Sequence, residues 1–207
     1  LVDDKCPDRS TLDLIWFPAG GGKTEAYFAV AAFDLIHRRL IYGDEGAGTA
    51  VITRYTLRLL ASQQFDRTAT FMCSLEMLRR EKGSLLGKEI FSLGFYAGQD
   101  ASPNNYKKAY EKYEAMLEEE SPDNPFVLQR CPLCATPIIP KIRSENRKDY
   151  GINCTDISFR FNCPSTSCDL HKHIPISVID EDLYEHPPSF LLGTIDKFAR
   201  LAWDHRA

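Results

Sequence analysis

The chain has 207 residues, of which 43% are apolar and 26% charged, and its formal net charge is −4. This composition is typical of a globular protein with an apolar core, and it excludes a polycation that attracts nucleic acid over its whole surface. No run of 18 apolar residues occurs, so no membrane-spanning helix is predicted. The first residues also lack the basic start and apolar stretch of a signal peptide.

The first hundred residues alternate between short apolar runs and helical patterns. We predict strands over residues 12–17, 49–53 and 89–96, and helices over residues 23–40 and 56–80. Glycines lie where elements should end, with Gly43 after the first helix and Gly98 after the third strand. This alternation is typical of a parallel sheet with right-handed connections, and we assign residues 1–100 to an α/β core.

The second half of the chain has a different character. Residues 103–120 are dense in Lys, Glu and Tyr and predict a solvated helix, on which Tyr106, Tyr110 and Tyr113 form a packing stripe. A core strand over 189–193 and a short helix over 195–203 follow much later. We therefore predict a charged helical insertion at 101–129, a zinc-ribbon-like insertion at 130–185 and a return to the core at 186–207.

A glycine-rich segment joins the first predicted strand to the first predicted helix. It reads FPAGGGKT over residues 17–24 and differs from the pattern G-x-x-x-x-G-K-[ST] only in Phe17, which replaces the first glycine. Glycines let backbone N–H groups turn toward phosphate oxygens, and the helix N-terminus adds a favourable field. Lys23 would then reach the β- and γ-phosphates of ATP, and Thr24 would hold Mg²⁺. The residues predicted to contact the nucleotide are Pro18, Ala19, Gly20, Gly21, Gly22, Lys23, Thr24 and Glu25.

Four of the seven cysteines form two closely spaced pairs. Cys131 and Cys134 are separated by two residues, and Cys163 and Cys168 by four. A nucleotide-binding loop indicates a cytoplasmic protein, in which thiols stay reduced and paired cysteines are metal ligands more often than disulfides. Two such knuckles can place four thiolates around Zn²⁺ in a closed structural site. Cys154, His171 or His173 could replace one ligand, and the alternative is a degenerate ribbon without metal.

Basic residues follow the second predicted strand. Thr53 at the strand end can cap the next helix and offer N–H groups to a phosphate, while Arg54 and Arg58 lie four residues apart on one helix face. Between Arg54 and Arg80 there are five arginines against two acidic residues, a local charge of +3. This pattern predicts contact with a nucleic-acid backbone, and the alternative is that the arginines are solvated or pair with acids.

Several of these segments resemble the motifs of a known family. FPAGGGKTEA at 17–26 is similar to motif I of superfamily 2 helicases, VITRYTLR at 51–58 to motif Ia, and LGTIDKF at 192–198 to the TP-x-x-L segment. Together with the four-cysteine insertion, TRYTLRLLASQQ and GTIDKFARLAW resemble the large helicase-like subunit of the DISARM anti-phage system.

This resemblance implies a P-loop, RecA-like parallel sheet with helices on both faces, in the N-terminal part of an ATP-dependent DNA helicase or translocase. It implies ATP, Mg²⁺ and Zn²⁺ as cofactors, DNA rather than RNA as nucleic acid, and other subunits of a defence complex as partners. The residues placed on the nucleic-acid backbone are Thr53, Arg54, Arg58, Thr194 and Lys197. The alternatives are a nucleotide-gated zinc-ribbon binding module without motor activity and a P-loop kinase or another nucleotide-binding protein.

ATP hydrolysis also needs an acidic residue that holds Mg²⁺ and polarises the attacking water. The run ISVIDED at 176–182 offers Asp180 and Glu181 at the end of an apolar stretch. In the resembling family the acidic motif follows the segment equivalent to 192–198, whereas Asp180 precedes it. We therefore expect these carboxylates to be solvated and the acidic motif to lie beyond Ala207, so that this stretch alone binds nucleotide without turning it over.

Overall fold

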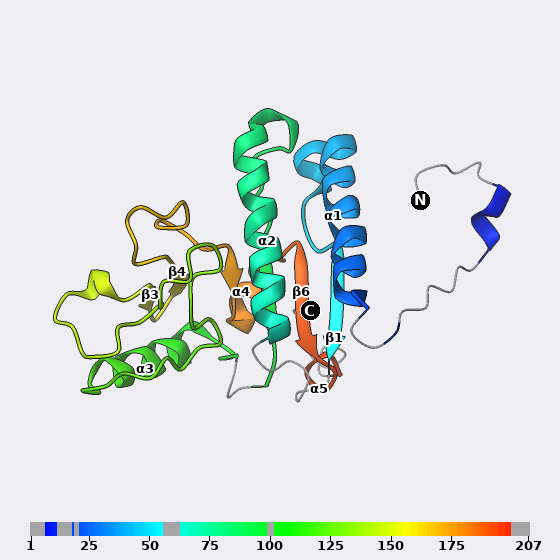
Figure 1. Ribbon diagram of the computed structural model, residues 1–207. Helices are drawn as coiled ribbons and strands as arrows, with labels where there is room; N and C mark the ends of the chain where they lie inside the picture. The colour runs from blue at the N-terminus through cyan, green and yellow to red at the C-terminus, as the bar shows by residue number, and fades with distance from the viewer. Residues whose placement is uncertain (1–6, 12–17, 19–20, 56–62, 99–101, 200–207) are drawn as a thin grey trace.

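The computed structural model describes residues 7–11, 18, 21–55, 63–98 and 102–199 (Figure 1). Its α-helices are α1 (Lys23–Tyr42), α2 (Gln63–Lys82), α3 (Tyr106–Leu117), α4 (Asp180–Glu185) and α5 (Ile195–Phe198). Its strands are β1 (Val51–Tyr55), β2 (Leu93–Tyr96), β3 (Ile152–Thr155), β4 (Ser158–Phe161), β5 (Ile176–Ser177) and β6 (Phe190–Thr194). Short 3₁₀ helices are η1 (Pro7–Ser10), η2 (Gly43–Gly46), η3 (Gly83–Leu85) and η4 (Arg147–Asp149).

Four parallel strands form the central sheet, in the order β1-β6-β2-β5. β6 lies between the two strands that precede it in the chain: Phe190 is opposite Val51 of β1 on one side and opposite Leu93 of β2 on the other. β5 pairs with the free side of β2. Because the strands are parallel, their carboxyl ends meet at one edge of the sheet, the lower edge in Figure 1, which we call the carboxyl edge.

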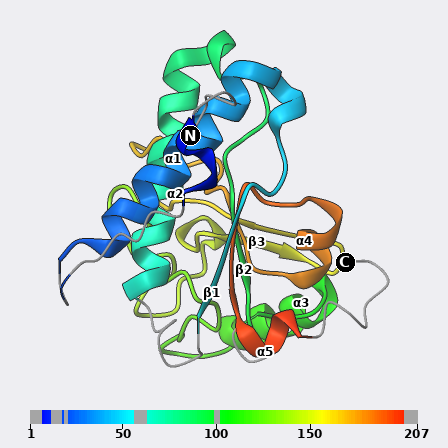
Figure 2. The same cartoon turned by 90° about the vertical axis from the view of Figure 1, so that its right-hand side faces the viewer.

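Helices cover the sheet on both faces. Successive side chains of a strand point to opposite faces, and β2 shows this with two adjacent aromatic residues. Phe95 packs edge-to-face on Phe65 of α2, with ring centroids 5.2 Å apart. Tyr96 packs on Tyr184 of α4, with centroids 6.2 Å apart. α1 and α2 therefore lie on one side of the sheet and α4 on the other (Figure 2), and β2 is buried along its whole length, as expected of a strand covered on both faces.

The segment between β2 and β5 extends beside the sheet and has its own small core. The hairpin of β3 and β4 is antiparallel, with Ile152 opposite Phe161, and α3 packs against it. Three aromatic rings fill the space, with the centroid of Phe159 4.7 Å from that of Phe126 and 4.9 Å from that of Phe161. Tyr113 of α3 is buried and Tyr106 and Tyr110 pack against the core, so the predicted packing stripe is confirmed.

The predicted elements largely correspond to observed ones. The strands predicted over 49–53, 89–96 and 189–193 are β1, β2 and β6, and the helices predicted over 23–40, 56–80 and 103–120 are α1, α2 and α3. This confirms a mixed α/β class with a parallel sheet. The strand predicted over 12–17 and the end of the helix predicted over 195–203 lie outside the described residues. Among the residues that are described, no helix has the length and apolar character needed to cross a bilayer.

Candidate functional site

The carboxyl edge brings together residues from distant parts of the chain. α1 begins at Lys23, and its first turn lies toward the lower side of the molecule in Figure 1 but apart from the strand ends in Figure 2. β1 carries Thr53 and Arg54 toward the same edge, and β6 ends there at Thr194. Thr53, Arg54 and Thr194 thus lie toward one edge of the sheet, although β1 and β6 are far apart in the sequence.

The turn before α1 has the conformation that a glycine-rich loop requires. Gly22 has φ of +83°, a left-handed conformation that side chains with Cβ rarely adopt. The N–H of Gly21 donates to the carbonyl oxygen of Pro18 at 2.9 Å, which closes a tight turn. Lys23 is exposed and Thr24 half-buried at the start of the helix. The predicted contacts of Ala19 and Gly20 lie outside the described residues.

A hollow of about 410 Å³ lies between the first turns of α1 and α2. Glu25 of α1 forms an ion pair with Arg67 of α2 across it. The rings of Phe28 and Phe71 are stacked beside this pair, with centroids 4.6 Å apart. Glu25, predicted to lie near the nucleotide, therefore borders an open hollow next to Lys23.

The residues predicted to contact nucleic acid differ in their exposure. Arg54 is exposed, whereas Thr194 is buried. The hydroxyl of Thr53 is buried and accepts or donates no hydrogen bond among the described residues. Arg58 lies outside the part of the chain that the structure describes.

Lys197 is buried in an ion pair. Its ammonium lies 2.5 Å from a carboxylate oxygen of Asp180, donates to the side-chain oxygen of Asn104 at 3.2 Å and lies 5.0 Å from the ring centroid of Tyr96. Contact of Lys197 with a nucleic-acid phosphate would require this pair to open. The expectation that Asp180 is solvated is wrong: it is only 5% exposed, because α4 and α5 enclose the pair between them.

The four paired cysteines converge on one point. The sulfur atoms of Cys131 and Cys168 are 3.7 Å apart, and those of Cys134 and Cys163 are 3.4 Å apart. All four lie within 4.8 Å of one another. Four thiolates at about 2.3 Å from Zn²⁺ in a tetrahedron would be about 3.8 Å apart. The donor set and its spacing fit a closed structural zinc site, and the two knuckles predicted from the sequence can hold a zinc ion.

The local environment separates the titration of these thiols. Burial opposes ionisation of Cys134, but hydrogen bonds from the side chain and backbone of Thr136 outweigh it and lower the pKa of this thiol to about 6. Burial raises the pKa of Cys131 to about 11 and also raises the pKa of Cys163. A metal ion that binds all four as thiolates must displace the protons of the buried ones.

The other candidate ligands lie outside the group of four. Cys154 is buried on β3, and burial raises the pKa of its thiol to about 12. A ring nitrogen of His171 lies 2.9 Å from the carbonyl oxygen of Cys163, which places it behind a ligand, where it can orient the knuckle. His173 is half-buried, and burial lowers its pKa. Among the described residues, none of these three joins the four cysteines as a ligand.

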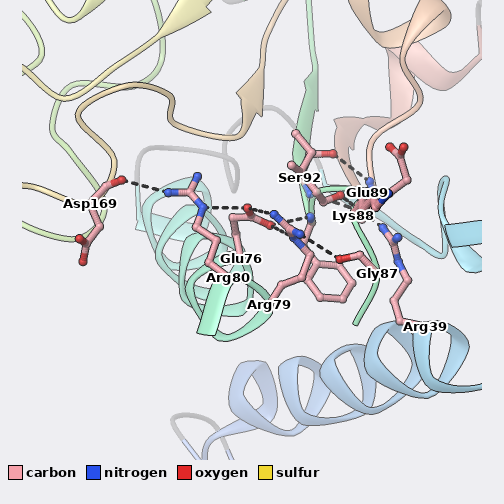
Figure 3. A network of polar contacts seen from close by, with 12 residues as sticks. Arg39, Glu76, Arg79, Arg80, Gly87, Lys88, Glu89, Ser92 and Asp169 are labelled. Atoms are coloured by element: carbon pink, nitrogen blue, oxygen red, sulfur yellow. Dashed lines mark hydrogen bonds and ion pairs between the residues drawn. The ribbon is translucent and has the colours of Figure 1, made fainter. Parts of the chain in front are cut away.

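A polar network on α2 reaches the cysteine site through Arg80 (Figure 3). The sequence analysis did not predict it. The carboxylate of Glu76 is completely buried and accepts hydrogen bonds from Arg79 and Arg80 at 2.8–2.9 Å. It also accepts from the backbone N–H of Phe91 at 3.1 Å. The helical spacing of one glutamate followed three and four residues later by arginines is the signal that could have revealed it.

The structure thus defines a mixed α/β protein with a parallel four-stranded sheet and a four-cysteine site suited to zinc. No protein-family model matches the chain. Among curated proteins, DISARM protein DrmA of Bacillus paralicheniformis is 36% identical to it, over an alignment of 222 residues that covers 100% of this chain and 19% of that relative. The chain is therefore a homologue of one part of a larger protein, and spans about a fifth of its length. The resemblance to a DISARM subunit inferred from the sequence is confirmed.

Proposed function

We propose that this chain is the nucleotide-binding, RecA-like part of a superfamily 2 DNA helicase or translocase that acts in defence against phages. The observation that carries the proposal is the start of α1 directly after Gly21 and Gly22, with Gly22 in the left-handed conformation of a glycine-rich turn. Ligands of parallel α/β sheets bind beyond the carboxyl ends of the strands, and a helix N-terminus there favours phosphate. The similarity to DISARM protein DrmA supports the defence role.

In this proposal each residue of the edge has a defined task. The backbone N–H groups of the loop after Pro18 cradle the phosphates, Lys23 contacts the β- and γ-phosphates, and Thr24 supplies a hydroxyl ligand to Mg²⁺. Glu25 borders the nucleotide and holds Arg67 across the hollow. The triphosphate provides the free energy of hydrolysis, and this chain supplies its binding and orientation.

The nucleic-acid backbone lies along the same edge in this proposal. Arg54 is exposed at the end of β1, and Arg58 follows it by four residues in the sequence. Thr53 and Thr194 contribute through strand ends that pair side by side in β1 and β6. Zn²⁺ in the cysteine site is structural, because four protein thiolates leave no open position for a substrate.

ATP turnover by the full-length protein, with and without single- and double-stranded DNA, tests the proposal. We expect DNA to stimulate turnover and Lys23→Ala to abolish it. Lys88→Ala is a matched control, because Lys88 is exposed at the opposite end of the sheet and should turn over ATP like the wild type. Tight ATP binding without turnover under any nucleic acid would instead identify a nucleotide-gated zinc-ribbon binding module.

A further inference from the structure

The α2 helix contacts both cysteine knuckles. In each knuckle, the contact is to the backbone carbonyl of the residue directly after one of the cysteines. Arg80 donates from its guanidinium to the backbone carbonyl oxygen of Asp169 at 3.0 Å, and Asp169 directly follows Cys168. In the first half of α2, the hydroxyl of Thr70 lies 3.4 Å from the backbone carbonyl oxygen of Pro132, which directly follows Cys131. A helix that packs on the sheet therefore also touches the loops that carry the metal ligands.

The guanidinium of Arg80 is oriented by a second contact besides the one to the knuckle. Its Nε donates to the buried carboxylate of Glu76 at 2.9 Å, while a terminal nitrogen of the same guanidinium reaches Asp169 (Figure 3). Glu76 is in turn fixed by Arg79 and by the N–H of Phe91. Because the guanidinium is planar and already oriented, little side-chain entropy is lost when it holds the knuckle.

The charge of Arg80 suits a zinc site with four thiolates. Four thiolates around a divalent cation carry a net charge of about −2, and a cation near them stabilises that charge. Groups outside the ligand shell that orient metal ligands commonly change metal affinity by about 10–100-fold.

We propose that Arg80 is a positioning residue for the second knuckle and that it couples metal binding to α2. The inference rests on the zinc site of the proposed function. Arg80 orders the loop at Cys168–Asp169 for the metal, and the bound metal orders the C-terminal half of α2. Such a coupling is reciprocal, so a change that weakens metal binding through Arg80 also removes the effect of the metal on the helix.

Two measurements on the zinc-loaded and zinc-free protein test this coupling: zinc affinity by competition with a chromophoric chelator, and hydrogen exchange of the amides of α2. Lys82→Ala is the matched control, because Lys82 is a cation at the same end of α2 that pairs with the exposed carboxylate of Glu81, outside the Glu76 network. We expect Arg80→Ala to lower zinc affinity about tenfold and to abolish zinc-dependent protection of α2. Lys82→Ala should leave both zinc affinity and the zinc-dependent protection of α2 unchanged.

The outcomes separate the inference from the zinc site itself. If Arg80→Ala accelerates exchange of α2 equally with and without zinc, and affinity stays at the wild-type value, Arg80 only stabilises the helix and the coupling is disproved. If the wild type binds no zinc, the metal site itself is disproved and the coupling with it. Neither result bears on ATP turnover, which the Lys23→Ala experiment tests separately.

Discussion

The parallel sheet and the cysteine insertion belong to one chain but are stabilised in different ways. In the sheet, fully or nearly fully buried apolar side chains from distant segments pack together, among them Phe65, Phe95 and Phe190. Between β2 and β5, the described residues form regular structure only in α3, the short helix η4 and two strands of four residues each, and the loops that carry the four paired cysteines lie outside these elements. The insertion has a small apolar core around Phe126 and Phe161, and the sulfur atoms of its four paired cysteines lie within 4.8 Å of one another.

This difference predicts that the two regions depend differently on metal. Burial of apolar surface stabilises the sheet whether or not an ion is present. Loops without a regular hydrogen-bond ladder have less to hold them, and in small cysteine modules the free energy of metal binding supplies the stability. Removal of zinc by a chelator should therefore destabilise the insertion before the sheet. Variants in either region should show which elements depend on the metal.

Replacing Cys163 and Cys168 together by serine should have the largest effect. Structural zinc sites contribute apparent free energies of about 10–16 kcal/mol at neutral pH, so we expect the variant to contain no zinc and to lose hydrogen-exchange protection in β3 and β4, while β6 stays protected. Zinc content and peptide-resolved exchange measure both effects. Ser167→Ala, an exposed change within the same knuckle, should keep the metal; wild-type zinc content in the double variant would refute the assignment.

Breaking the Asp180–Lys197 pair should strongly destabilise the junction between the insertion and the sheet. Both residues are 5% exposed, and removal of one partner of a buried ion pair typically costs about 3–5 kcal/mol. We expect Asp180→Ala to lower the free energy of unfolding by that amount in denaturant titrations. The double variant Asp180→Ala, Lys197→Met should recover much of the loss, and no recovery would show that the pair is not the cause.

The buried Glu76 carboxylate should make stability depend on pH. Burial would raise its pKa, but hydrogen bonds from Arg79, Arg80 and the Phe91 N–H outweigh burial, so its pKa is lowered in the folded state. Its contribution is therefore present above the unfolded pKa, about 4.3, and is lost as the pH falls through the lower folded value. We expect Glu76→Gln to be less stable near pH 7 and to lose less stability between pH 5 and pH 3, measured by denaturant titration. An unchanged pH profile would contradict this.

The smallest effect is expected on the surface of the insertion. Arg147 is 67% exposed and lies 3.5 Å from a carboxylate oxygen of Glu114. Exposed ion pairs contribute less than about 1 kcal/mol, so Arg147→Ala should shift the free energy of unfolding within that range at any salt concentration. A larger loss would show that α3 depends on this contact and that the insertion is held by more than its core and its cysteines.

Recurring apolar residues were sufficient to predict most helices and strands. One predicted strand was too long, and its backbone hydrogen bonds explain why. The strand expected over 89–96 begins only at Leu93. Phe91 is fully buried, as its apolar character suggested, but its N–H donates to the side chain of Glu76 and not to a neighbouring strand. Hydropathy reports burial and cannot distinguish these two partners.

In the candidate sites too, features set by local sequence were predictable and contacts between distant elements were not. The spacing of the cysteines was sufficient to predict the group of four, because short knuckles constrain geometry locally. The environment of Asp180 was not predictable, since its partner Lys197 lies on another element and no local pattern links them. Arg80 was recognised as part of a positive stretch, but its contact with Asp169 depends on how α2 packs against the insertion.

The position of β6 has a consequence for how the protein is made. β1 and β2 do not pair with each other, and each pairs with β6 (Phe190–Thr194). β6 is synthesised after the whole insertion. Contacts within the insertion are closer in sequence, so it can fold during synthesis while the sheet cannot. The nascent chain therefore exposes the unpaired edges of β1 and β2 until synthesis passes Thr194, an interval in which chaperones and aggregation compete for it.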